Sequence, residues 1–351
     1  MLTKALKSNP NNVALMPLDL LVGALDCGRE SAQGKRVNYP EEGWMHSPDV
    51  SFYAILPTPF DSEGRVDEAA VRANVEQVAT HGIRGVLLTG SYGEFQTLDD
   101  DERVLVTRCV SESGAMASIM SGAAAVRAAA AETLGRRLFD AGAHQVMVSA
   151  PFAAELTDDD LLVHFDQLAD ALAHDLVIYN NPVFGVDLSP VLLERVAVHD
   201  AVVAVKQGTK MLASMVDSIA RLERPDGARV LAAADFTCAA AVGVGASGVT
   251  STNVWVFPEA FLALADPGVD GVAKRSILSA LRPYANLVRR FGQPRTVKAA
   301  MHIRGYAGGG YVRLPYNELD ADQRRELEVS LGACDEALAT IPKAAFAGSF
   351  A

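Results

Sequence analysis

Short apolar runs alternate with longer segments of helical period between residue 52 and about residue 265. The runs are apolar at consecutive positions rather than at every second one, which is typical of parallel strands covered on both faces. They are FYAIL (52–56), RGVLLTG (84–90), MASIMSG (116–122), HQVMVSA (144–150), LVIYN (176–180), AVVAVK (201–206), RVLAAAD (229–235) and ASGVTST (246–252). The segments between them, such as 67–82 and 126–142, end on glycine, a common helix stop signal.

Eight strand–helix pairs predict a (β/α)₈ TIM barrel over residues 51–265. An open, doubly wound sheet is the alternative, but its G-x-G-x-x-G turn does not follow the first run. Residues 266–351 are predicted to form a C-terminal α-helical region. Three segments there have the period of helices: 271–292, 294–306 and 320–341. Residues 1–50 are rich in Asn, Pro and Gly, and predict an irregular N-terminal extension.

Charge and composition narrow the possible partners. The formal net charge is −12, and Lys and Arg are not clustered, so neither nucleic acid nor an anionic membrane surface is an expected partner. Asp19 and Asp26 interrupt the apolar N-terminal stretch, so we predict no signal peptide and a cytoplasmic location. The four cysteines lie far apart without a C-x-x-C pair, and the histidines are scattered, so no zinc site is expected.

Two ionisable side chains end neighbouring predicted strands. Active sites of such barrels lie at the carboxyl ends of the strands, where Tyr179 ends the fifth run and Lys206 the sixth. Neighbouring strands are about 5 Å apart, so these side chains should meet. A desolvated amine has its pKa lowered from about 10.4 toward neutrality and can form a Schiff base with a ketone, while a phenol beside it can transfer protons. Lys210, the rival lysine, falls in the next helix start and is expected to be solvated.

The segment TGSYGEF (89–95) follows the second predicted strand. It turns at Gly90 and Gly93, which exposes backbone N–H groups and the Ser91 hydroxyl, and several donors at one place suit a carboxylate. Glu94 is predicted to cap the structure that follows.

Other strand ends supply further candidates. Thr58 near the first strand and Thr250 near the eighth are predicted to contact the substrate. Asp235, after the seventh, is predicted to cap a helix rather than to line the pocket.

The segments GSYGE (90–94), YNNP (179–182) and VKQGT (205–209) follow strands two, five and six in this order. This set resembles the dihydrodipicolinate synthase and N-acetylneuraminate lyase superfamily, and LPTPFDSEGRVD (56–67) and VRLPYNEL (312–319) add to the likeness. The resemblance covers about residues 52–340. It implies a pyruvate-type class I aldolase or dehydratase that is usually a homotetramer and works without metal or organic cofactor.

The resemblance also implies roles for single residues. Lys206 matches the Schiff-base lysine, and Tyr179 matches the tyrosine that acts as general acid and base. Ser91 matches the hydroxyl that holds the carboxylate of the keto acid together with the next residue. That next residue is usually Ser or Thr in the family, whereas here Tyr92 is predicted to narrow the pocket or to add a second phenol.

Two departures from the family pattern shape the functional prediction. Phe152 and Ala153 stand where the synthase has a tyrosine pair, and Phe184 stands where it has an arginine that binds the carboxylate of the aldehyde substrate. Losing a charge-assisted hydrogen bond of this type costs on the order of 1.5 to 3 kcal/mol. We therefore predict a Schiff-base lyase acting on a 2-keto acid, such as pyruvate or a 2-keto-3-deoxy acid, and not the lysine-pathway synthase proper. Aldol cleavage, dehydration and condensation are all open.

Two alternatives accompany this prediction. The first is 4-hydroxy-tetrahydrodipicolinate synthase activity with an altered site. The second is a non-catalytic protein that binds a keto acid or sugar acid, although binding alone needs no amine at a desolvated strand end.

Overall fold

The computed structural model describes residues 50–343 and 346, except for residues 154, 185, 226 and 234 and the side chain of Phe184. The predicted N-terminal extension therefore lies, apart from its last residue, outside the described residues. The domain boundaries predicted at residues 51 and 265 stay predictions.

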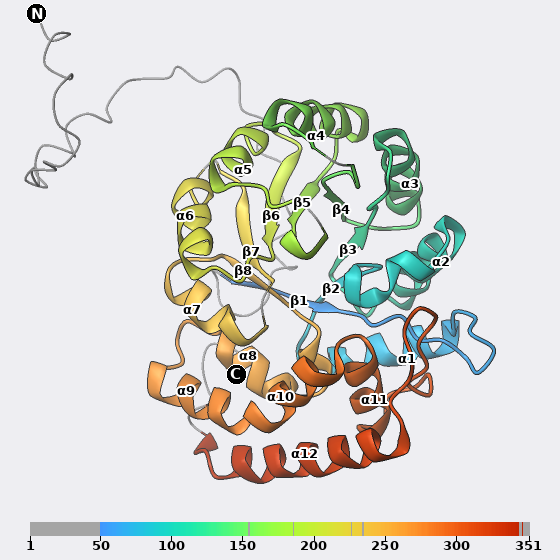
Figure 1. Ribbon diagram of the computed structural model, residues 1–351, viewed down its shortest axis with the longest axis vertical. Helices are drawn as coiled ribbons and strands as arrows, with labels where there is room; N and C mark the ends of the chain where they lie inside the picture. The colour runs from blue at the N-terminus through green and yellow to red at the C-terminus, as the bar shows by residue number, and fades with distance from the viewer. Residues whose placement is uncertain are drawn as a thin grey trace, which may run out of the picture. The chain divides into compact units, whose positions relative to one another are not determined.

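Eight parallel strands form a closed barrel, with β1 paired to both β2 and β8 (Figure 1). The strands are β1 (Ser51–Ile55), β2 (Gly85–Leu88), β3 (Ser118–Gly122), β4 (Gln145–Ser149), β5 (Leu176–Asn180), β6 (Val202–Gln207), β7 (Arg229–Ala232) and β8 (Gly248–Ser251). Each lies within or overlaps one of the eight apolar runs, so the predicted (β/α)₈ fold is confirmed.

Eight helices alternate with these strands and surround the barrel in Figure 1. They are α1 (Glu68–Ala79), α2 (Asp100–Ser113), α3 (Ala128–Asp140), α4 (Asp158–Leu172), α5 (Pro190–Val196), α6 (Leu212–Leu222), α7 (Cys238–Gly243) and α8 (Pro258–Ala265). Capping side chains start several of them. Asp99 accepts a hydrogen bond from the Glu102 amide at the start of α2, and Thr157 accepts one from Asp160 at the start of α4.

The C-terminal helical region is also confirmed, with one boundary that differs. It contains α9 (Gly271–Ala280), α10 (Arg282–Phe291), α11 (Arg295–Ile303) and α12 (Ala321–Ala339). The segment 271–292, predicted as one helix, is two, because Pro283 has no N–H group to continue the hydrogen-bond ladder and fits only in the first turn of a new helix.

The helices were compared with the length and apolar character of a membrane span. Of those in the described part of the chain, none combines the length and the apolar character that crossing a bilayer would require. The cytoplasmic location stays a prediction.

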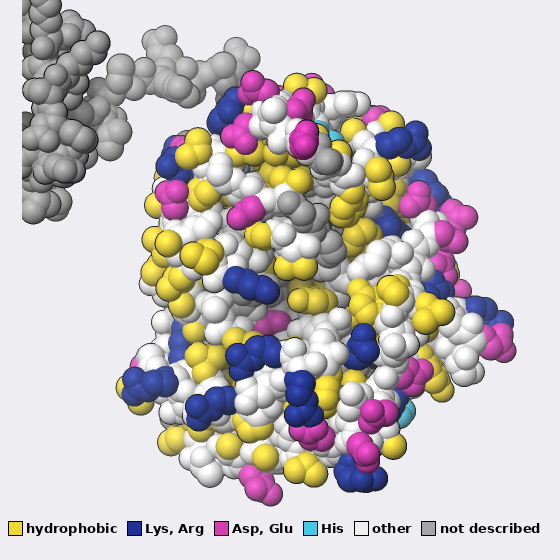
Figure 2. Space-filling model, in the orientation of Figure 1, with side chains coloured by type: hydrophobic (Ala, Val, Ile, Leu, Met, Phe, Trp, Pro, Cys, Tyr) yellow, Lys and Arg dark blue, Asp and Glu magenta, His cyan; other side chains and the backbone are white. Residues whose placement is uncertain are grey.

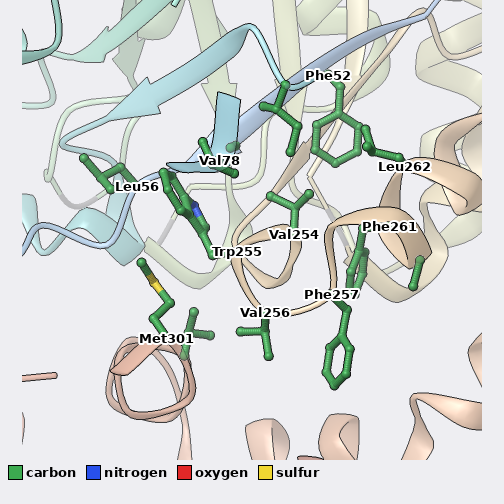
Figure 3. Close-up of a cluster of buried hydrophobic side chains, with 14 of the residues drawn as sticks. Phe52, Leu56, Val78, Val254, Trp255, Val256, Phe257, Phe261, Leu262 and Met301 are labelled. Atoms are coloured by element: carbon green, nitrogen blue, oxygen red, sulfur yellow. The ribbon is translucent and has the colours of Figure 1, made fainter. Parts of the chain in front are cut away.

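A buried cluster joins the barrel to the C-terminal helices. Trp255, in the short 3₁₀ helix η7 (Asn253–Trp255) after β8, donates from its indole Nε1 to the carbonyl of Ile55 at 2.7 Å. Figure 3 shows its ring beside Leu56 and Val254, with Met301 on α11 across from it. Because these side chains come from the segments just after β1 and β8 and from α11, burial of one cluster fixes the C-terminal helices against the rim of the barrel.

A glycine is required where β3 approaches the loop after β2. A Cβ atom on Gly122 would lie 2.5 Å from the carbonyl oxygen of Thr89, a backbone atom that cannot move aside like a side chain. Gly122→Ala is expected to lower the free energy of unfolding by about 1 to 3 kcal/mol, the usual cost of overpacking, in urea titrations. Gly332→Ala in α12 is the control, because nothing lies within 4 Å of its added Cβ. That variant should be neutral or more stable by up to about 1 kcal/mol, and equal losses in both would contradict the steric argument.

Candidate active site

Lys206 and Tyr179 meet at the carboxyl ends of two paired strands. The register of β5 with β6 places Tyr179 directly opposite Lys206. The Lys206 ammonium nitrogen lies 3.6 Å from the centre of the Tyr179 ring, and the two residues are only 3% and 8% exposed. Lys210, the rival lysine, is exposed. The structure therefore supplies the desolvated amine and the adjacent phenol that imine chemistry requires.

The Tyr179 hydroxyl is surrounded by groups that favour loss of its proton. It lies 3.3 Å from Ser91 Oγ and accepts a hydrogen bond from Asn181 Nδ2 at 2.8 Å. Burial acts to raise the pKa of Tyr179, but the charge of Lys206 and hydrogen bonds with Ser91, Lys206 and Asn181 outweigh it. The net pKa lies below the ordinary value of 10.0, so the phenol is suited to exchanging a proton.

The loop that carries Ser91 is held against the barrel. Its turn is the short 3₁₀ helix η3 (Ser91–Gly93), and the Thr58 hydroxyl donates to the Gly93 carbonyl at 2.6 Å. A Cβ atom on Gly90 would lie 2.7 Å from a Leu87 methyl group, so the chain packs closely there. Thr58 thus supports the loop, and its contact with the substrate stays a prediction, as does that of Gly90.

Three more predicted site residues are Tyr92, Thr250 and Phe184. Tyr92 packs on the side chains inside the barrel, and burial, followed by the nearby charge of Asp235, raises its pKa to about 12. Thr250 is buried, and its hydroxyl has no hydrogen-bond partner in the part of the chain that the structure describes. The side chain of Phe184 lies outside the described residues.

Glu94 has a different place from the one predicted for it. It caps no helix with its side chain, and it is fully buried. Its carboxylate accepts hydrogen bonds from Lys298 Nζ and, at 3.0 Å, from the backbone N–H of Arg313. These partners come more than 200 residues later in the chain. No local pattern around Glu94 could have predicted them.

Asp235 is a second residue whose predicted role was wrong. Thr237, not Asp235, is the residue before α7, and its side chain makes no capping hydrogen bond with that helix. The Asp235 carboxylate instead accepts a hydrogen bond from Asn253 Nδ2 at 2.6 Å. Burial raises the pKa of Asp235 to about 6, although hydrogen bonds from Ser251 and Asn253 and the charge of Lys206 act in the opposite direction. A carboxyl group with a raised pKa is therefore close enough to Lys206 to feel its charge.

A small pocket opens beside Ser91 and Tyr179, and Gly90, Met147 and Phe152 also line it. Figure 2 shows the molecule hollowed near the centre of one face, with basic side chains along part of the rim. A larger groove of about 900 Å³ lies elsewhere, between α8 and α12, and none of the predicted site residues whose side chains are described lines it. In the described ranges no cluster of three or more His, Cys, Asp or Glu side chains could hold a metal ion.

Comparison with known proteins identifies the family. A model of the dihydrodipicolinate synthetase family matches residues 50–334. A 4-hydroxy-tetrahydrodipicolinate synthase from Geobacter sulfurreducens is 31% identical over 282 residues, which is 79% of this chain and 95% of the relative. One from Exiguobacterium is 30% identical over 276 residues, 78% of this chain and 93% of the relative. The solved structure of the synthase from Methylacidiphilum fumariolicum SolV superposes with a TM-score of 0.77 at 24% identity, covering 84% of this chain and 99% of that one.

These relatives correct the functional prediction. Phe152, Ala153 and Phe184 predict that the chain is not the lysine-pathway synthase, yet relatives at about 30% identity over most of the chain carry that name. The exclusion was wrong because it rested on a few substituted positions, whereas the likeness extends over the whole barrel. A carboxylate can also be held by groups other than a guanidinium at one particular position.

Proposed function

Because the chain belongs to the dihydrodipicolinate synthetase family, whose members are class I lyases, we propose that it has 4-hydroxy-tetrahydrodipicolinate synthase activity. The observation that carries the proposal is the buried Lys206 amine, 3.6 Å from the ring centre of Tyr179 at the mouth of the barrel. A barrel that only bound a keto acid would have no need of this amine.

The reaction follows from the chemistry of an amine and of the product. Lys206 Nζ adds to the carbonyl carbon of pyruvate, and loss of water leaves an imine. The protonated imine withdraws electrons, so the methyl group loses a proton and becomes the nucleophilic carbon of an enamine. This carbon attacks an aldehyde and forms the new carbon–carbon bond.

The product sets the class of the second substrate. A tetrahydrodipicolinate has two carboxylates on either side of a ring nitrogen, so the aldehyde must also carry an amine and a carboxylate. That amine then attacks the imine carbon, closes the ring and releases Lys206 as the free amine.

The neighbouring groups have distinct parts in this proposal. Tyr179 gives a proton to the leaving hydroxyl when the imine forms and exchanges protons with Ser91, whose oxygen is 3.3 Å away. The Ser91 hydroxyl and the backbone N–H groups of its loop bind the carboxylate of pyruvate. A homo-oligomer, as the family resemblance implies, belongs to the same proposal and can be tested by sedimentation.

Trapping of the imine tests the proposal directly. The protein is incubated with pyruvate and borohydride, digested, and analysed by mass spectrometry for a reduced adduct on Lys206. Activity is then assayed with pyruvate and L-aspartate 4-semialdehyde. An adduct together with turnover supports the proposal, whereas no adduct with pyruvate would overturn it.

We expect chelators to leave the activity unchanged, because every step above uses only side chains of the protein. Activity before and after dialysis against EDTA measures this. Reversible inactivation, restored by a divalent metal ion, would contradict the expectation.

A further inference from the structure

Glu94 links the Ser91 loop to the C-terminal helical region. It directly follows η3, with a left-handed backbone conformation (φ 59°), and its amide donates to the Ser91 carbonyl at 3.3 Å. The next amide, that of Phe95, donates to the Gly90 carbonyl at 3.3 Å. The direction of the Glu94 side chain is therefore tied to the position of Ser91, three residues earlier.

Lys298 holds the Glu94 carboxylate from α11. The two residues are 4% and 0% exposed, and the ammonium group donates to one carboxylate oxygen of Glu94. The same ammonium donates to the Tyr311 carbonyl at 2.7 Å and lies 4.0 Å from the centre of the Phe60 ring. A buried charge is tolerated only with such partners, so this pair has one strongly preferred geometry.

Arg313 completes the contact between the loop and the C-terminal region. Its backbone N–H donates to the second carboxylate oxygen of Glu94 at 3.0 Å. Its guanidinium pairs with Glu102 of α2 at 2.5 Å and lies 4.3 Å from the centre of the Phe60 ring. Both oxygens of Glu94 are thus bound by residues beyond the barrel, and the loop cannot shift without breaking a buried ion pair.

We propose that the buried Lys298–Glu94 pair positions Ser91 against Tyr179, so that the C-terminal helical region sets the geometry of the pyruvate-carboxylate site. Lys298 and Glu94 are positioning residues, because they act through the loop and do not touch the reacting atoms. The inference rests on the proposed function, since it assigns pyruvate to this loop. A merely structural pair would affect stability and leave pyruvate binding unchanged in the folded protein.

The experiment measures the pyruvate concentration that gives half-maximal borohydride trapping on Lys206 in the full-length protein. We expect Lys298→Met to raise it about 10- to 100-fold, the equivalent of one charge-assisted hydrogen bond, while saturating pyruvate still gives the adduct. Glu94→Gln keeps the shape of the side chain and is also expected to raise the pyruvate concentration that gives half-maximal trapping. The double variant should show less than the product of the two single effects, because both break one interaction.

Lys274→Met is the matched control. Lys274 is also a buried lysine of the C-terminal region, on α9, and the charged groups that act on it are Cys238 and Asp266 rather than residues of the Ser91 loop. This variant should trap pyruvate like the wild type. Thermal unfolding of each variant shows whether it is folded, and if Lys298→Met is not, Glu94→Gln decides.

The pH dependence provides a second readout. Burial lowers the pKa of Lys298 to about 8, with Arg313 acting in the same direction and Glu94 opposing. As the pH rises from 7 to 9, Lys298 loses its proton and the ion pair with Glu94 is lost. The pyruvate concentration that gives half-maximal trapping should therefore rise. Lys298→Met should lose this increase, and Lys274→Met should keep it.

The outcomes separate the two proposals. If the wild type gives no adduct, the proposed function fails. If the wild type traps pyruvate, and folded Lys298→Met and Glu94→Gln do so at the same concentration, only the positioning inference is overturned.

Discussion

Lys206→Ala is expected to reduce turnover to the background rate and to remove the borohydride-trapped pyruvate adduct. The reason is chemical: alanine has no amine to form the imine, and the neighbouring phenol cannot replace it as an electron sink. Steady-state assays and mass spectrometry of the trapped protein measure the two effects. Because Lys206 is almost fully buried, thermal unfolding must show that the variant is folded.

Lys210→Ala is the matched control for this prediction. Lys210 lies four residues later, is exposed, and belongs to the connection between β6 and α6. The variant should form the adduct and turn over like the wild type. If the adduct persists in Lys206→Ala and disappears in Lys210→Ala, then Lys210, and not Lys206, is the lysine that forms the imine.

Tyr179→Phe is expected to slow turnover by roughly 10²- to 10⁴-fold, the usual contribution of a general acid and base. The phenyl ring keeps the packing beside Lys206 but cannot give a proton to the leaving hydroxyl. The loss should appear in the rate of imine formation, measured by trapping in a quenched time course. The final amount of adduct should reach that of the wild type.

Tyr306→Phe controls for the loss of a buried phenol as such. Tyr306 is 5% exposed and packs edge-on against Trp255 in the groove between α8 and α12. Its hydroxyl group has no part in the proposed reaction, so the rate of imine formation should not change. A Tyr179→Phe variant that forms the imine at the wild-type rate would refute the proton-transfer role.

The local sequence pattern was sufficient to predict the barrel because most strands are built around consecutive apolar residues that are buried. LVIYN and AVVAVK are buried on both faces, so consecutive apolar residues identify β5 and β6, and strand order along the chain is strand order in the barrel. The break at Pro283 was missed because apolar periodicity continues through it, although proline restricts the backbone there.

Single substituted positions are a weak basis for predicting the function of this chain. The missing guanidinium at Phe184 predicts that one substrate is not bound, but the likeness to named synthases extends over some 280 residues. A single substitution shows which contact one side chain cannot make with the substrate. It does not show which contacts other groups at the mouth of the barrel make with it.

The sequence by itself determined the barrel, the two strand ends that carry Tyr179 and Lys206, and the loop with Ser91, because each depends on residues close together in the chain. The tertiary structure alone decided the partners of Glu94 and the surroundings of Asp235. Lys298 and Arg313 reach Glu94 across more than 200 residues. Such contacts form only when the C-terminal helices pack on the barrel, and no local pattern encodes that burial.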